Sequence, residues 1–201
     1  MRFDSPIDDI FLNRSHVRIL RALHHLPEGL PASGREIARR AGVTHPTVSR
    51  ALALLVDAGL VTAGRSSAGD AYELNRDHFF ADRIADLYRA DAGVKEALAT
   101  FLRQELLART DKVEWATLFG SIVWGDSTPT SDIDLAVTCA RADVSEVEKA
   151  LSDISDGTRR EFGNHVNPLI NTRKQRPKSG IWKRIEKEGV SLIRSSKAIS
   201  S

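Results

Sequence analysis

The second half of the chain carries the stretch FGSIVWGDSTPTSDIDLAV at residues 119–137. The apolar runs Val113–Ser121 and Asp132–Thr138 at its two ends have the composition of buried strands. A Gly-Ser pair and a loop rich in turn-forming residues separate the two runs. Asp132 and Asp134 are two residues apart on the second strand, so both carboxylates project from the same face. The stretch therefore predicts two strands, joined by a loop or short helix and a turn, with paired carboxylates on the second.

The spacing of these residues suits the binding of a triphosphate. Gly120 and Ser121 lie where the first strand is expected to turn into a helix, and backbone N–H groups and the Ser121 hydroxyl can hold phosphate oxygens there. Asp132 and Asp134 can share Mg²⁺, which holds the triphosphate and neutralises the charge that develops during in-line attack. A lone Asp-x-Asp pair also occurs in ordinary acidic turns. A Gly-Ser pair with eleven residues from Ser121 to Asp132, between two apolar strands, is much more specific.

The whole unit resembles the signature of the minimal nucleotidyltransferases of the DNA polymerase β superfamily, in which Gly-Ser follows a strand and Asp-x-Asp lies on the next. Gly125 matches a further glycine that is often found between the two motifs. The resemblance implies that Gly120 and Ser121 bind the nucleotide. It also implies that Asp132 and Asp134 are catalytic residues and metal ligands, with Mg²⁺ as the cofactor and an NTP, in the first place ATP, as the substrate.

Active members of this family usually add a third carboxylate on a later strand. After a helix expected at 144–162, the next candidate strand is His165–Asn171, and its register offers Asn167 in that place. A neutral amide cannot serve as a base near neutral pH. Three other residues are candidates for the missing role: Glu161, Asp143 and His165. The sequence thus predicts nucleotide binding and leaves it open whether the domain is an enzyme.

The first part of the chain contains EIARRAGVTHPTVSRALALLVDAGLV at residues 36–61. Apolar periodicity predicts a helix over 7–26, a short second helix capped by Ser33, and a third helix that begins after Thr44. The polar, Gly-rich stretch that follows predicts a β-hairpin. This order resembles the winged helix-turn-helix domains of bacterial and archaeal regulators over residues 8–76.

The exposed face of the third helix is the candidate DNA-binding surface. It presents short hydrogen-bonding side chains and one arginine, which suit phosphates and base edges: His45, Thr47, Ser49 and Arg50. The alternative is a helical bundle with a polar surface. The resemblance favours binding to double-stranded DNA.

Two further helices are expected from Phe79 to Ala108, with a break near Ala92-Gly93. Their apolar residues follow a 4-3 spacing, which is consistent with a connector between domains or with a dimerisation seam, and symmetric operator binding favours a homodimer. Because minimal nucleotidyltransferases are often paired with small helical proteins in toxin–antitoxin systems, the resemblance also allows a small helical partner.

Charge and composition restrict the partners, the cysteine chemistry and the location that can be expected. The net charge of +2 creates no strong overall field, but the segment from Arg173 to Lys197 holds nine Lys or Arg against two Glu. Its loop at 171–180 can face phosphates of a substrate, phosphates of DNA, or solvent alone. The single Cys139 excludes an internal disulfide and a Cys-based zinc site. No apolar run reaches the roughly 18–20 residues of a membrane span, and the acidic N-terminal residues do not match a signal peptide, so a cytoplasmic protein is expected.

These observations predict an α+β chain with three parts. They are a winged helix-turn-helix domain at 1–78, a helical linker at 79–110, and a nucleotidyltransferase-like domain with a mixed sheet at 111–201. The first functional hypothesis is a DNA-binding enzyme that transfers a nucleoside monophosphate from an NTP to a hydroxyl of a protein or small molecule. The alternative is a transcriptional regulator whose second domain binds nucleotide or a partner without catalysis.

Overall fold

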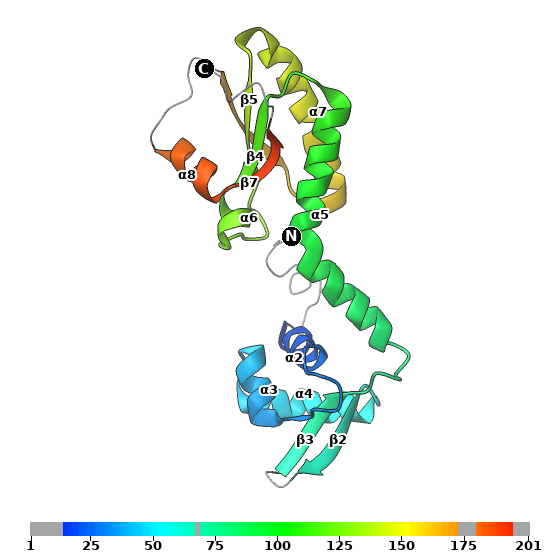
Figure 1. Ribbon diagram of the computed structural model, residues 1–201. Helices are drawn as coiled ribbons and strands as arrows, with labels where there is room; N and C mark the ends of the chain where they lie inside the picture. Colours follow the sequence, from blue (N-terminus) through cyan, green and yellow to red (C-terminus); the bar gives the residue numbers. More distant parts are fainter. Residues whose placement is uncertain (1–13, 67–68, 173–179, 195–201) are drawn as a thin grey trace. The chain divides into compact units, whose positions relative to one another are not determined.

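The computed structural model describes residues 14–66, 69–172 and 180–194 (Figure 1). Contacts between residues divide the chain into two units, with the boundary between Ala92 and Gly93. This boundary lies inside one long helix, α5 (Ala81–Arg109). Among the described helices, none combines the length and the apolar character that are needed to cross a membrane.

The N-terminal unit consists of three helices followed by a hairpin, which confirms the predicted winged helix-turn-helix order. Its elements are α2 (Arg14–His24), β1 (Ala32–Ser33), α3 (Gly34–Ala41), α4 (His45–Asp57), β2 (Val61–Ser66) and β3 (Gly69–Leu74). The short strand β1 pairs antiparallel with β3 and was not expected from the sequence. The start of the predicted first helix falls on residues 1–13, which lie outside the described residues.

The turns between these helices have local causes. The Ser33 hydroxyl accepts a hydrogen bond from the Glu36 N–H at 3.3 Å, as expected of a helix cap. Gly42 ends α3 with a φ of 62°, a left-handed conformation that favours glycine. Thr44 occupies the cap position of α4, but its side chain makes no capping hydrogen bond and instead lies 2.8 Å from the Thr47 hydroxyl.

A compact apolar core holds the helices and the hairpin of this unit together. Its most buried members include Ile19, Leu23, Ile37, Val48 and Leu52, each 0–1 % exposed. The first part of α5 is attached to α2 by polar contacts: the Tyr88 hydroxyl donates to the Val17 carbonyl at 2.8 Å, and Arg21 pairs with Asp91 at 3.0 Å.

The expected break near Ala92-Gly93 is wrong, because α5 continues through it for 29 residues. A glycine inside a helix costs only about 1 kcal/mol relative to alanine. Burial of Leu98, Leu102 and Leu106, all 0 % exposed, is worth more than that for each side chain. Tertiary packing therefore outweighs the local signal for a break.

The C-terminal unit is built on a four-stranded sheet of order β6-β5-β4-β7. Its strands are β4 (Trp115–Phe119), β5 (Ile133–Cys139), β6 (Val166–Thr172) and β7 (Val190–Arg194). Its other elements are α6 (Ser121–Trp124), the 3₁₀ turn η1 (Arg141–Asp143), α7 (Val144–Phe162) and α8 (Ile181–Glu188). β5 and β6 run parallel while the other neighbours are antiparallel, so the predicted mixed sheet is confirmed.

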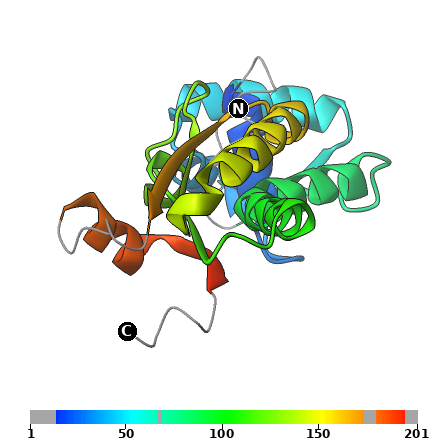
Figure 2. The same cartoon turned by 90° about the horizontal axis from the view of Figure 1, so that it is seen from above.

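Helices cover both faces of this sheet. Ile133, Leu135 and Val137 of β5 belong to a core that includes residues of α5 and α7. Alternate residues point the other way, where Ala136 packs with Trp115 and with Trp182 and Ile185 of α8. Figures 1 and 2 show α7 and α8 on opposite sides of the strands. By alternation, Asp134 shares the α8 side of β5 with Ala136.

Candidate functional site

The predicted nucleotide-site residues gather where β4 ends and β5 begins. In the sheet register Asp134 stands opposite Phe119, the last residue of β4, and beside Asn167 of β6. Asp132 immediately precedes β5 and is exposed, whereas Asp134 is half-buried. The structure therefore brings the carboxylate of Asp134 next to the Gly-Ser turn that follows β4.

Gly120 is the residue that permits this approach. Its φ of 79° and ψ of −158° lie in a region that is essentially reserved for glycine. A Cβ atom at Gly120 would lie only 2.0 Å from Oδ2 of Asp134. Ser121 then begins α6, and Gly125 ends this helix with a φ of 88°. The Asp134 carboxylate thus occupies the space that a side chain at position 120 would fill.

Asn167 occupies the place beside the acidic pair that the sequence predicted. Its amide Nδ2 donates a hydrogen bond to Oδ1 of Asp134 at 2.9 Å. The parallel pairing of β5 and β6 sets this contact, because Asp134 and Asn167 are direct register partners. The two oxygens of Asp134 therefore face different neighbours: Oδ2 faces Gly120 and Oδ1 faces Asn167.

Two of the other candidates for a third acidic or basic group, Asp143 and Glu161, lie apart from this contact. Asp143 ends η1, beyond the far end of β5, where its charge adds to burial in raising the pKa of the Cys139 thiol. Glu161 lines a groove together with Phe101 and Glu105. The third candidate, His165, is exposed, and its carbonyl accepts a hydrogen bond from the Ile133 N–H at 2.7 Å, so its backbone lies beside the start of β5. Within the described ranges, no three His, Cys, Asp or Glu side chains form a group suited to a metal ion.

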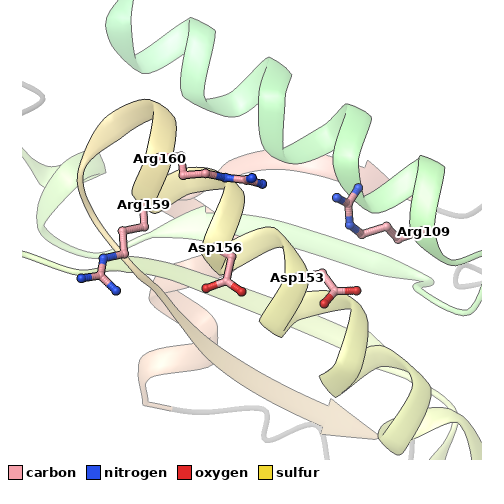
Figure 3. Close-up of a pocket in the computed structure, with 5 residues that line it drawn as sticks. All are labelled: Arg109, Asp153, Asp156, Arg159 and Arg160. Atoms are coloured by element: carbon pink, nitrogen blue, oxygen red, sulfur yellow. The ribbon is translucent and has the colours of Figure 1, made fainter.

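A pocket between α5 and α7 is lined by charged side chains: Arg109, Asp153, Asp156, Arg159 and Arg160 (Figure 3). Arg109 is paired with Glu105 one helical turn earlier. Because α5 and α7 cover the face of the sheet opposite α8, this pocket is separate from Asp134. Its mixture of both charges on exposed helix surfaces is typical of a solvated face.

The predicted DNA-contacting residues lie on one helix, α4. His45, Ser49 and Arg50 are exposed and Thr47 is half-buried. The Ser49 hydroxyl donates to the His45 carbonyl at 3.1 Å, and Nε of Arg50 donates to the Pro46 carbonyl at 3.4 Å. Among the described residues, the two terminal NH₂ groups of Arg50 have no hydrogen-bond partner.

A charged cluster on α3 adjoins the turn that leads to α4. The Glu36 carboxylate accepts hydrogen bonds from Arg39 at 2.7 and 2.9 Å and from Arg40 at 2.6 Å. These arginines lower the pKa of Glu36 to about 2. The pairing holds both guanidinium groups on the surface of α3. This cluster was not among the residues predicted from the sequence, although the spacing of three and four residues from Glu36 to Arg39 and Arg40 is a recognisable signal.

The basic loop that was considered as a phosphate-facing segment falls mostly on residues 173–179. These lie outside the described residues.

Comparison with protein families finds two matches. Residues 12–71 match the MarR family, and residues 103–198 match the family described as polymerase beta, nucleotidyltransferase. A search of curated proteins finds no match.

Several solved structures are similar to parts of the chain. One is a proposed DNA-binding protein from Ralstonia eutropha JMP134, with 23 % identity, coverage of 39 % of this chain and 99 % of that chain, and a TM-score of 0.34. Another is a toxin–antitoxin complex with AMP-PNP, with 19 % identity, coverage of 50 % and 76 %, and a TM-score of 0.35. A third is a mutant of ZitR from Lactococcus lactis, with 17 % identity, coverage of 49 % and 64 %, and a TM-score of 0.35.

The two family matches coincide with the two structural patterns described above. The MarR match spans the helices and most of the hairpin of the N-terminal unit, and the second match spans the whole mixed sheet. The chain therefore joins a winged helix domain that matches the MarR family to a second domain that matches the polymerase beta nucleotidyltransferase family.

Proposed function

We propose that this DNA-binding protein transfers a nucleoside monophosphate from an NTP to a hydroxyl of a protein or small molecule, at the site formed by Gly120, Ser121, Asp132 and Asp134. The observation that carries the proposal is the contact between the Gly-Ser turn and the acidic strand. A Cβ at Gly120 would lie 2.0 Å from the Asp134 carboxylate. Position 120 must therefore be glycine for Asp134 to keep this position.

The side chains present suit a divalent cation and a triphosphate. Asp132 and Asp134 supply carboxylate oxygens, the ligands that Mg²⁺ prefers. When bound, Mg²⁺ would neutralise negative charge on the phosphates during transfer. The hydroxyl of Ser121 can donate to a phosphate oxygen. The half-buried position of Asp134 fixes one carboxylate, while the exposed Asp132 remains accessible to an incoming ligand.

A second function is favoured by one specific observation. The hydrogen bond from Asn167 to Asp134 at 2.9 Å places an amide where a third carboxylate would act as a base. On this reading the domain binds nucleotide without turnover, and the chain is a transcriptional regulator. Duplex DNA is the proposed partner in both cases. A homodimer, a small helical partner and a cytoplasmic location remain predictions from the sequence.

The experiment that separates the two functions is nucleotidyl transfer with α-labelled NTPs. The protein would be incubated with each NTP, Mg²⁺ or Mn²⁺, and cell lysate as the source of acceptor. Label that becomes bound to an acceptor with the wild type, and not with Asp134→Asn, supports transfer. Mg²⁺-dependent NTP binding without any labelled acceptor supports the regulator. Absence of both binding and transfer would refute the nucleotide site.

A further inference from the structure

Helix α8 places an arginine against the helix that follows the Gly-Ser turn. Trp182 and Ile185 anchor α8 to the sheet through their buried side chains. On the flank of the helix, the guanidinium carbon of Arg184 lies 3.6 Å from the centre of the Trp124 ring. This distance corresponds to a close cation–π contact. Arg184 is thereby attached to α6, although the two residues are far apart in the sequence.

The guanidinium of Arg184 is held from a second side. Its Nε donates to Oε2 of Glu188 at 2.8 Å, one turn later on α8. In the part of the chain that the structure describes, the two terminal NH₂ groups of Arg184 have no hydrogen-bond partner. The side chain is 50 % exposed, so a ligand can reach it from solvent. The Trp124 ring and the Glu188 carboxylate orient the planar guanidinium of Arg184. Its two terminal NH₂ groups can donate to two oxygens of one phosphate.

The position of Trp124 connects this arginine with the nucleotide site. Trp124 is the last residue of α6, and its backbone N–H donates to the Gly120 carbonyl at 3.0 Å. Its ring lies 6.4 Å from that of Phe119, which directly precedes Gly120. A contiguous set of contacts thus runs from the Asp134 carboxylate through the Gly-Ser turn and Trp124 to Arg184.

The nucleotide site is negatively charged, so a positive side chain near the Gly-Ser turn would favour binding of a triphosphate. Asp132 and Asp134 are acidic, and a triphosphate adds further negative charge. A single Mg²⁺ leaves the sum negative, so a positive group near the turn lowers the repulsion. We propose that Arg184 binds the phosphate chain of the NTP, with its two terminal NH₂ groups donating to non-bridging oxygens. This inference rests on the proposed nucleotide site. It implies that Arg184 of α8 makes the site bind nucleoside triphosphates more tightly than monophosphates.

The test is calorimetric titration of the full chain with ATP, ADP and AMP in the presence of Mg²⁺. Loss of charge-assisted hydrogen bonds in Arg184→Gln is expected to weaken ATP binding by about 10- to 100-fold, with a smaller effect on AMP. Arg184→Lys keeps the charge without the fork and is expected to fall between the wild type and Arg184→Gln.

Lys183→Gln is the matched control. Successive helical residues are about 100° apart, so Lys183 and Arg184 lie on opposite flanks of the edge formed by Trp182 and Ile185. Lys183→Gln removes the same charge from the same helix and is expected to change ATP affinity by less than about twofold, because exposed charges are screened.

The outcomes separate the inference from the function on which it rests. Equal ATP affinity in the wild type and Arg184→Gln, with loss of binding in Asp134→Asn, would overturn the role of Arg184 and leave the nucleotide site intact. Equal weakening by Lys183→Gln and Arg184→Gln would also overturn it, because a general charge effect would then explain both. Absence of ATP binding by the wild type would remove the proposed function and the inference together.

Discussion

Replacing Gly120 with alanine tests the contact on which the nucleotide site depends. The φ of 79° and ψ of −158° impose a backbone penalty on alanine of roughly 1–3 kcal/mol. The new Cβ would also lie 2.0 Å from Oδ2 of Asp134, so the carboxylate must move away. Movement of Asp134 breaks its hydrogen bond with Asn167, which is worth about 1 kcal/mol at an exposed position. Together these effects predict a loss of stability of about 2–4 kcal/mol.

Gly125→Ala is the matched control for this substitution. Gly125 has a φ of 88°, but a Cβ there would meet no atom within 4 Å. Only the left-handed backbone penalty of about 1–2 kcal/mol is therefore expected. Mg²⁺-dependent NTP binding should be lost in Gly120→Ala and retained in Gly125→Ala, because only the first displaces Asp134.

Urea denaturation followed by tryptophan fluorescence measures this directly. All three tryptophans, Trp115, Trp124 and Trp182, lie in the C-terminal unit, so the signal reports the unfolding of that unit. Combining Gly120→Ala with Asp134→Ala removes the carboxylate that the new methyl group would meet. The alanine at 120 should then cost less than in the wild-type background, as a double-mutant cycle measures. Equal losses in Gly120→Ala and Gly125→Ala, with NTP binding intact in both, would refute the reasoning.

Three further changes probe catalysis, DNA binding and pH dependence. Asn167→Asp is expected to raise the rate of nucleotidyl transfer, by up to roughly 10²–10⁴-fold, if a base is what the site lacks; fast wild-type turnover would show that another residue does this. Arg50→Ala should weaken specific duplex binding by about 1–3 kcal/mol if Arg50 reads a base edge, whereas a uniform loss and a salt slope reduced by about one unit would indicate a phosphate contact. Burial, followed by His25, Arg76 and Arg89, lowers the pKa of His24 below 6.5, so the unfolded chain takes up the proton first and stability should fall as the pH drops below that value. Melting temperatures at pH 7.5 and 5.5 check this, and an identical pH dependence in His24→Gln would contradict it.

Features with local causes were predictable from the sequence alone. Helix and strand periodicities, the cap at Ser33 and the left-handed end at Gly42 arise from residues within a few positions of each other. The alternation around Asp132 and Asp134 likewise identified one face of a strand before any pairing was known. These signals were sufficient for the order of three helices and a hairpin in the N-terminal unit, for the strands on either side of the Gly-Ser turn, and for the acidic half of the candidate site.

Features that depend on distant residues required the tertiary structure. The family resemblance placed Asn167 beside the acidic pair, but the hydrogen bond with Asp134 across 33 residues depends on the parallel pairing of β6 with β5. Arg184 reaches Trp124 because Trp182 and Ile185 fix α8 on the sheet. The helix α5 continues through Gly93 because leucines further along it are buried in the core. In each case the deciding free energy comes from packing or pairing between segments that are far apart in the chain. Local propensity, which contributes at most about 1 kcal/mol at such a glycine, does not report on those contacts.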